Sequence, residues 1–254
     1  MKFFGDYHLH TRVSDGRVDI NAHAAAAKRK GLSEIAISDH SFSTLFFHAT
    51  KKKLLRQRKE IDLLERCGVK VYNGIEGNLI GDKLDVPDEV IRELDVLTAG
   101  FHRFITPTKM RGESRFLLKN GFGSERAKKA LIDENTRNYI SVMENYPIDI
   151  IAHLGHRAPV DFKAVCECAK KHGVYLELNA KHLDALEEGI DEAIASGVNF
   201  IVGTDAHSTK NTGEFGEVEK FIIRYGIPLN RVYGVDGNLP TFKDKKEWTY
   251  GRDV

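Results

Sequence analysis

Short apolar runs alternate along the chain with longer segments of helical period. The runs are rich in Val, Ile and Leu at successive positions, which is typical of parallel strands buried on both faces. They span residues 3–9, 34–38, 69–75, 96–101, 148–152, 174–178 and 200–203. Because a helical segment separates each run from the next, the pattern predicts a parallel sheet with helical crossovers.

The helical segments carry recognisable ends. Asp19 is expected to cap a helix that stops at Gly31, and Asp161 one that stops at Gly173, since short polar side chains cap helix starts and glycine favours helix ends. The two longest helices are predicted at residues 51–67 and 124–145. One further helix, ending near Gly197, is expected to bury a single face formed by Leu183, Leu186, Ile190 and Ile194.

Histidines and carboxylates stand where the predicted strands end. The strand exits carry His8 and His10, Asp39 and His40, Glu76, His102, His153, Glu177 and Asn179, and Asp205 and His207. A barrel collects the carboxyl ends of all its strands at one mouth, whereas an open sheet spreads them along a crevice. Scattered core histidines have no reason to occupy so many strand exits. The pattern therefore favours an α/β fold closed into a barrel, with polar groups converging at its mouth.

Composition limits the class of protein. The chain has 254 residues, of which 41% are hydrophobic and 30% charged, and we expect residues 1–254 to form a single domain. A formal net charge of +1 argues against a non-specific nucleic-acid coat. No apolar run reaches membrane-spanning length, no secretory signal opens the sequence, and three cysteines suggest no disulfide framework. We therefore expect a cytoplasmic protein without a membrane partner.

Two short motifs carry metal-binding chemistry. In His8-Leu9-His10 the spacing of two places both imidazoles on one side of an extended strand, and Asp205-Ala206-His207 repeats that spacing. Taken alone, the first motif could be two exposed histidines, and Asp39-His40 could be an ordinary solvated loop. Together, mixed imidazole and carboxylate ligands suit Zn²⁺, Mn²⁺ or Fe. The potential ligands exceed the needs of one ion, so we expect at least two ions and favour three.

Seven segments, in this order, resemble the PHP (polymerase and histidinol phosphatase) family, and most closely its small single-domain phosphatases. The segments are Asp6-Tyr7-His8-Leu9-His10-Thr11, Ser14-Asp15-Gly16, Ser38-Asp39-His40, Gly74-Ile75-Glu76, Gly100-Phe101-His102, Ala152-His153 and Gly203-Thr204-Asp205-Ala206-His207. The resemblance covers residues 4 to about 235. It implies a distorted (β/α)7 barrel with a trinuclear metal site.

The resemblance also implies a ligand set for three divalent ions (Zn, Mn or Fe). One ion would be held by His8, His10, Glu76 and Asp205, and a second by Asp15, His40 and His207. A third would be held by His102 and His153, with Glu76 bridging to the first. The small phosphatases carry a histidine one residue after the position of Asp15, where this chain has Gly16. Other members of the family carry Asp here, so Asp15 stays in the set.

The expected reaction is hydrolysis of a small phosphomonoester such as histidinol phosphate, a nucleotide or a sugar phosphate. A metal-bridging hydroxide would attack the phosphorus, with Asp205 and His207 in the catalytic centre and Asp39 orienting a ligand histidine. Cationic side chains would hold the substrate phosphate. The candidates are Arg103, Arg111 and Arg115 in the long segment 103–124, together with Arg157 and Lys181.

Other functions remain open at this point. The chain could be a PHP nuclease or phosphodiesterase acting on oligonucleotides, although its balanced charge makes nucleic acid a less expected partner. It could also be a non-enzymatic metal-binding protein. A hydrolase of the amidohydrolase kind would leave Glu76 and His207 unexplained. We expect ordinary structural roles for His23 and His182, an outer or surface position for His156, and a solvated face for Lys51–Lys53. The sequence does not predict the oligomeric state.

Overall fold

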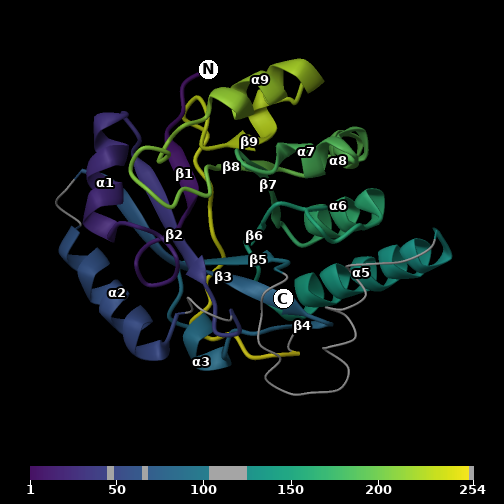
Figure 1. Ribbon diagram of the computed structural model, residues 1–254, viewed down its shortest axis with the longest axis horizontal. Coiled ribbons are helices and arrows are strands. Elements are labelled where there is room, and N and C mark those ends of the chain that lie inside the picture. Colours follow the sequence, from purple (N-terminus) through teal and green to yellow (C-terminus); the bar gives the residue numbers. More distant parts are fainter. Residues whose placement is uncertain (45–48, 65–67, 103–124, 252–254) are drawn as a thin grey trace.

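A computed structural model describes residues 1–44, 49–64, 68–102 and 125–251 (Figure 1). The expected contributions of Arg103, Arg111 and Arg115 lie outside these residues. No helix in the described ranges is both long and apolar enough to cross a membrane.

Parallel strands form the wall of a nearly closed barrel, so the α/β barrel expected from the sequence is confirmed. Their order around the sheet is β1-β2-β3-β5-β6-β7-β8-β9, and β4 pairs with β3 in antiparallel fashion outside this path. The strands are β1 (Gly5–Leu9), β2 (Glu34–His40), β3 (Lys70–Ile80), β4 (Lys83–Leu84), β5 (Val96–Gly100), β6 (Ile150–Ile151), β7 (Tyr175–Asn179), β8 (Phe200–Gly203) and β9 (Val232–Tyr233).

The seven predicted strands all form, and β9 adds an eighth parallel strand beside β8. The first strand closes the barrel against the carboxyl end of β8. There, the backbone N–H of His10 donates to the carbonyl of Ala206 at 2.9 Å. The buried carboxylate of Asp6 accepts from Thr204 Oγ1 at 2.6 Å and from the backbone N–H of Gly213. This closure fixes the first strand beside the segment that carries Asp205 and His207.

Helices cover the outside of the sheet, with α1 and α2 on one side and α5 to α8 on the other (Figure 1). The capping predicted for two of them is confirmed, since Asp19 accepts from Ala22 N and Asp161 from Ala164 N. The helices are α1 (Ile20–Arg29), α2 (Lys51–Leu64), α3 (Asp88–Ile91), α5 (Glu125–Asn145), α6 (Phe162–Lys171), α7 (Leu183–Glu187), α8 (Ile190–Ser196) and α9 (Gly216–Tyr225).

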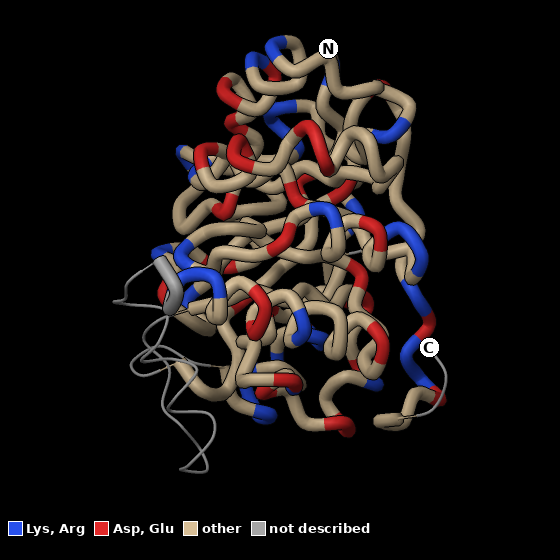
Figure 2. Tube along the Cα trace, turned by 90° about the vertical axis from the view of Figure 1, so that its right-hand side faces the viewer, with Lys and Arg blue, Asp and Glu red and all other residues tan. Residues whose placement is uncertain are grey.

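The charged side chains of both signs are mixed along the chain. Figure 2 shows Lys and Arg interspersed with Asp and Glu over the trace, as expected from a formal net charge of +1. A balanced surface of this kind provides little long-range attraction for a polyanion.

Several boundaries predicted from the sequence are wrong, and two of them bear on the fold and the site. The single helix expected before Gly197 is two helices, α7 and α8, interrupted at Glu188 and Gly189. A side chain at position 189 would overlap the ring of Phe162, because an ideal Cβ there lies 1.9 Å from Phe162 Cγ. The third strand runs on to Ile80 instead of stopping at Ile75, so Glu76 lies within β3. This strand is extended because it pairs with β2 and β5 along this stretch.

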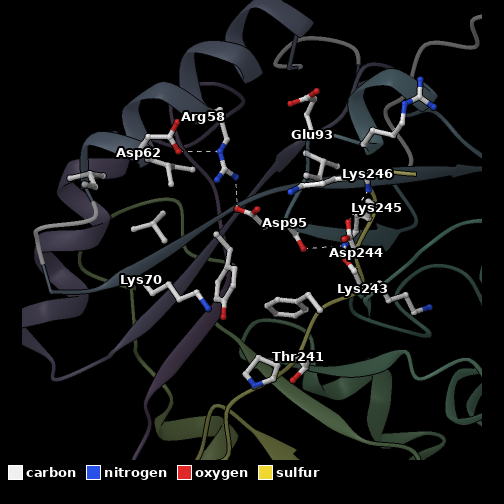
Figure 3. A pocket seen from close by; sticks show the side chains of 18 of the residues that line it. Arg58, Asp62, Lys70, Glu93, Asp95, Thr241, Lys243, Asp244, Lys245 and Lys246 are labelled. Atoms are coloured by element: carbon white, nitrogen blue, oxygen red, sulfur yellow. Dashed lines mark hydrogen bonds and ion pairs between the residues drawn. The ribbon is translucent and has the colours of Figure 1, made fainter. Parts of the chain in front are cut away.

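The amino-terminal end of the barrel is closed by the C-terminal segment of the chain. Lys245 is buried there, with its Nζ 2.6 Å from the carboxylate of Asp149 and 3.0 Å from the carbonyl of Asp95. Figure 3 shows Asp95 between this lysine and Arg58, at the edge of a cavity of about 950 Å³. The buried pair therefore ties the segment after β9 to the strands β5 and β6.

We expect Lys245→Met to destabilise the fold by about 3–5 kcal/mol, because it leaves the buried carboxylate of Asp149 without its cation. Lys246→Met is the matched control. The side chain of Lys246 is exposed, so this substitution should change stability by less than about 0.5 kcal/mol. Urea unfolding of the two variants measures the difference. Equal stability of the two variants would show that the pair does not hold the segment.

Candidate metal centre

The structure brings the nine expected ligands to one end of the barrel. Six strands supply them, either from their last residues or from the turns that follow. His8 lies in β1, His40 in β2 and Glu76 in β3. The remaining ligands follow strands β1, β5, β6 and β8, and they are His10, Asp15, His102, His153, Asp205 and His207.

The carboxylate of Glu76 lies at the centre of this group and is fully buried. Its Oε1 is 2.9 Å from His153 Nε2 and 3.3 Å from His102 Nε2. Its Oε2 is 3.1 Å from His40 Nδ1 and 3.5 Å from His8 Nε2. Each oxygen of one carboxylate thus faces different imidazoles, which is the geometry of a bridging ligand.

A second carboxylate, Asp15, approaches the group from the loop after β1. Its Oδ2 lies 3.1 Å from His207 Nε2 and 3.6 Å from His40 Nε2, and its Oδ1 lies 3.6 Å from His10 Nδ1. The third carboxylate, Asp205, has its Oδ1 3.4 Å from His10 Nε2. His10 therefore connects the two outer carboxylates.

Seven of the nine ligands gather into three overlapping groups, within each of which the ligand atoms all lie within 4.8 Å of one another. The groups share His10, His40 and Glu76, so neighbouring cations would share ligands. The groups are His10, Asp15, His40 and His207; His8, His10 and Glu76; and His40, Glu76 and His102.

Hydrogen bonds on the side of the ring away from the centre fix the tautomers of two histidines. His8 donates through Nδ1 to Glu177 Oε1 at 2.7 Å, and His102 donates through Nδ1 to Asn78 Oδ1 at 2.6 Å. The Asn78 amide is itself oriented, because its Nδ2 donates to Asp85. In each neutral ring the other nitrogen, Nε2, then carries a lone pair toward the centre, as a metal-ligating histidine requires.

The donor set fits divalent cations. His8 Nε2 and His10 Nε2 face each other at 3.0 Å. Four buried polar atoms of the cluster accept or donate no hydrogen bond, namely His10 Nδ1, His40 Nδ1, Glu76 Oε2 and His153 Nδ1. Unsatisfied buried polar atoms are costly. Cations at the centre would satisfy those of His10, His40 and Glu76, whereas His153 presents its other nitrogen, Nε2, to Glu76. Imidazole and carboxylate donors in this ratio suit Zn²⁺, Mn²⁺ or Fe.

The groups of the cluster also shift one another's pKa values. Burial disfavours charge on both His8 and His10, yet the carboxylates of Glu177 and Glu76 raise the pKa of His8 well above its ordinary value. The pKa of His10 stays well below its ordinary value, because burial is reinforced by the neighbouring His40. Burial alone would raise the pKa of Glu76, but His102 and His8 lower it strongly. The carboxylate therefore remains charged in this buried position.

Unusual backbone conformations support the centre. His153 and Asp205 have positive φ angles of 32° and 51°, a region that non-glycine residues rarely adopt and that is frequent at functional sites. Glycine is required beside them at two positions. A Cβ on Gly100 would lie 2.7 Å from Glu76 Oε1, and one on Gly203 would lie 2.1 Å from Glu177 Oε1.

Asp39 does not orient a ligand histidine as the sequence suggested. Its carboxylate, fully buried within β2, accepts hydrogen bonds from the backbone and hydroxyl groups of Thr11 and Ser14. Four donors satisfy the charge of this group, so it holds the loop between His10 and Asp15. Asp39 therefore affects the centre by fixing the position of that loop.

Two of the expected substrate cations lie in the described residues. Lys181 stands at the rim, with Nζ 3.0 Å from Asp205 Oδ1 and 2.9 Å from His207 Nδ1. Arg157 is exposed in the turn after His153 and has a positive φ angle of 59°.

Several residues at the centre were missed from the sequence. Glu177 and Asn78 stand behind His8 and His102, and His182 lies with its Nε2 3.9 Å from Asp205 Oδ2. His156 packs on His182 with ring centroids 3.9 Å apart, and burial beside His182 lowers its pKa to about 4. Two of these residues had a signal in the sequence, since Glu177 stands at a predicted strand exit and an outer position was one of the two expected for His156.

His23 also supports the centre from helix α1, although the sequence suggested an ordinary role. Its buried Nε2 donates to the carbonyl of His10 at 3.0 Å, so its Nδ1 accepts from the hydroxyl of Thr212 at 2.8 Å. This ring joins the end of β1 to the loop that follows His207.

A model of the PHP domain family matches residues 6–190. The chain belongs to this family, in agreement with the resemblance drawn from its motifs and with the barrel that carries them.

Individual relatives differ in length and in name. The chain is 28% identical over 248 residues to a "probable phosphatase" of Shewanella frigidimarina, a match that covers 91% of this chain and 89% of that protein. It is 32% identical over 217 residues to the DNA polymerase/3′-5′ exonuclease PolX of Bacillus subtilis. That match covers 80% of this chain and only 34% of the polymerase.

Among solved structures, the fold is similar to the histidinol phosphate phosphatase of Lactococcus lactis in complex with zinc, L-histidinol and phosphate. The TM-score is 0.64 at 17% identity, and the match covers 96% of this chain and 98% of that one.

We expect Glu177→Gln to weaken zinc binding about tenfold or more, because the amide removes the negative charge that supports the His8 N–H. Competition with a chromogenic chelator measures the affinity. Glu188→Gln is the control, because Glu188 is exposed at the end of α7. Unchanged zinc affinity in the Glu177 variant would contradict a supporting role for this carboxylate.

Proposed function

We propose that this protein is a metal-dependent phosphatase that hydrolyses a small-molecule phosphomonoester. The convergence of nine imidazole and carboxylate side chains at one end of the barrel carries the proposal. Similarity to a probable phosphatase over nearly its whole length supports the same class of reaction. The substrates that we consider are histidinol phosphate, a nucleotide and a sugar phosphate.

The proposed site holds three divalent ions (Zn, Mn or Fe). When bound, such cations supply a hydroxide nucleophile at neutral pH and neutralise the oxygens of the attacked phosphate. The proposed ligands are His8, His10, Glu76 and Asp205 for one ion, Asp15, His40 and His207 for a second, and His102 and His153 with the shared Glu76 for a third.

The side chains at the rim have separate roles in this proposal. Lys181, which contacts both Asp205 and His207, donates charge-assisted hydrogen bonds to a phosphoryl oxygen of the substrate. Arg157 approaches the same phosphate from the turn after His153. Asp205 and His207 belong to the catalytic centre as ligands beside this lysine. Arg103, Arg111 and Arg115 are proposed as further substrate contacts.

Asp39 acts in this proposal as a positioning residue for the loop that presents Asp15. Its four hydrogen bonds to Thr11 and Ser14 hold that loop against β2. The proposed reaction needs no side chain that forms a covalent bond to phosphorus, because the protein's contribution to catalysis is electrostatic.

We expect Asp205→Asn and His10→Ala each to lose bound metal and to lower kcat/KM for p-nitrophenyl phosphate at least about a hundredfold. Metal analysis and steady-state kinetics are measured on the same preparations. His172→Ala is the control, since His172 caps α6 at the opposite end of the barrel. Full activity in either site variant would refute the ligand assignment, and wild-type protein that binds metal without turnover would refute the phosphatase.

The similarity to the polymerase and exonuclease PolX favours a second candidate, hydrolysis of phosphodiesters in oligonucleotides. This match has the higher identity and covers 80% of the chain. The two functions differ in their response to salt. Because nucleic-acid binding releases counterions, oligonucleotide cleavage should weaken steeply between 50 and 200 mM salt, whereas hydrolysis of a small ester should change modestly. Salt titration of KM for both kinds of substrate decides between them.

A further inference from the structure

A carboxylate outside the metal centre, Asp85, is connected by hydrogen bonds to two of the candidate ligands. It follows strand β4, which turns back on the end of β3 as a short hairpin. Leu84 pairs with Leu79 in this hairpin, and the backbone N–H of Asp85 donates to the carbonyl of Asn78 at 3.2 Å. The hairpin therefore places Asp85 opposite Asn78, the residue that accepts from His102.

Four hydrogen bonds surround the carboxylate of Asp85. Its Oδ1 accepts from the backbone N–H of Asn78 at 2.8 Å and from the hydroxyl of Ser41. Its Oδ2 accepts from Asn78 Nδ2 and from the backbone N–H of Ser43, each at 2.8 Å. None of these four donors is a cation. The carboxylate therefore joins the end of β3 to the loop after β2 by accepting from neutral groups of both segments.

The carboxylate fixes the direction of the Asn78 amide, because an ionised carboxyl group can only accept hydrogen bonds. The amide nitrogen must face Asp85, and it also donates to Ser41 Oγ at 3.0 Å. Ser41 can accept there because its own hydroxyl hydrogen goes to Asp85. The amide oxygen is thereby turned toward His102, where it lies 2.6 Å from Nδ1.

The direction of the amide determines the tautomer of His102. Because Asn78 Oδ1 can only accept, Nδ1 of the neutral ring carries the hydrogen. Nε2 then keeps its lone pair and faces Glu76 Oε1 at 3.3 Å. If the amide were reversed, its N–H would face Nδ1, and the ring hydrogen would move to Nε2. A hydrogen at Nε2 would block the nitrogen that a metal ion needs.

Asp85 is connected to His40 by a second route. Ser41 follows His40 directly in the chain, and its hydroxyl donates to Asp85. The backbone N–H of Ser41 donates to the carbonyl of Glu76 at 3.0 Å, and Ser43 adds its own backbone bond to the carboxylate. The carboxylate thus holds the chain immediately after His40 against β3.

One of the three groups of ligand atoms described above consists of His40, Glu76 and His102. Each member of this group is connected to the carboxylate through Ser41 or Asn78. Both connecting residues are 0% exposed, so bulk water does not compete for their hydrogen bonds. A change in the carboxylate therefore acts on this group of ligands before it acts on the others.

We propose that Asp85 is a positioning residue of the metal centre and sets the affinity for the ion that His102 binds. It fixes the Asn78 amide and thereby the tautomer of His102, and it holds the chain next to His40. This role rests on the metal site of the proposed function. It extends that site to a carboxylate on a separate hairpin, which acts only through Asn78 and the loop after β2.

Zinc titration against a chromogenic chelator tests this role without any turnover. His102→Ala first identifies the step of the titration that depends on this histidine. We expect Asp85→Asn to weaken that step about tenfold. An amide has one acceptor oxygen where the carboxylate has two, so the Asn78 amide is no longer held in one direction. The steps that do not depend on His102 should change less.

Asp82→Asn is the matched control for the loss of charge. Asp82 is exposed in the turn of the same hairpin, so this variant should keep wild-type affinity at every step. Urea unfolding of all variants establishes that folded proteins are compared.

The exchange Asp85→Asn/Asn78→Asp separates positioning from a merely structural role. It moves the carboxylate to the residue beside His102 and lets the new amide donate to it. The hydrogen on Nδ1 then has an acceptor that cannot be reversed. We expect the exchange to recover most of the zinc affinity that Asp85→Asn loses.

Three results would overturn the proposal. They are an unchanged His102-dependent step in Asp85→Asn, an exchange that recovers no affinity, and a wild-type titration in which no step depends on His102. The proposed function fails separately, since wild-type protein that binds zinc but hydrolyses no phosphate ester would refute the phosphatase. The zinc titration would still decide the role of Asp85 in that case.

Discussion

The carboxylate of Glu76 is the group on which the rest of the centre depends. It is buried among five imidazoles in the interior of the barrel, and neighbouring histidines keep its pKa low despite that burial. An isolated charge in such a position would be very unfavourable. The carboxylate is tolerated because positive charge, in the form of protons or metal ions, is held by the nitrogens that face both of its oxygens.

The strand ends of the barrel bring the ligands together, and a surrounding layer of residues holds the ligands in place. Parallel strands bring the chain to the same end of the barrel each time, so groups distant in sequence meet there. A surrounding layer of Glu177, Asn78 and His23 then fixes ring orientation and backbone position. Asp39 and Asp6 perform the same work for two loops, each by accepting several hydrogen bonds. Buried carboxylates thus serve as hydrogen-bond acceptors that organise the loops around the centre.

Much of the fold was predictable from the sequence because its signals are local. Apolar runs predict strands, and Asp19 and Asp161 cap their helices where expected. The polar residues at the strand exits predicted the barrel, because a closed barrel brings all its strand ends to one mouth. The break at Gly189 was not predictable, because it depends on the ring of Phe162, which comes from a distant helix.

The supporting residues at the centre were harder to predict than the ligands. His23 and His182 lie on or beside helices, where a histidine usually has no special partner, and only tertiary contacts give them one. Asp39 was expected to orient a ligand histidine, because carboxylates commonly do so in metal sites. Adjacent residues on a strand point to opposite faces, so His40 faces the centre while Asp39 faces the loop of Thr11 and Ser14.

The same alternation explains why a cleft forms beside the centre. The side chain of Asp39 draws the loop after β1 against β2, and the carbonyl of the next residue, His40, holds the segment that leads into α2. The loop and the helix are thereby fixed on either side of a cleft of about 330 Å³. The side chain of one strand residue places the loop that carries Asp15, and the backbone of the next residue places the segment before the helix.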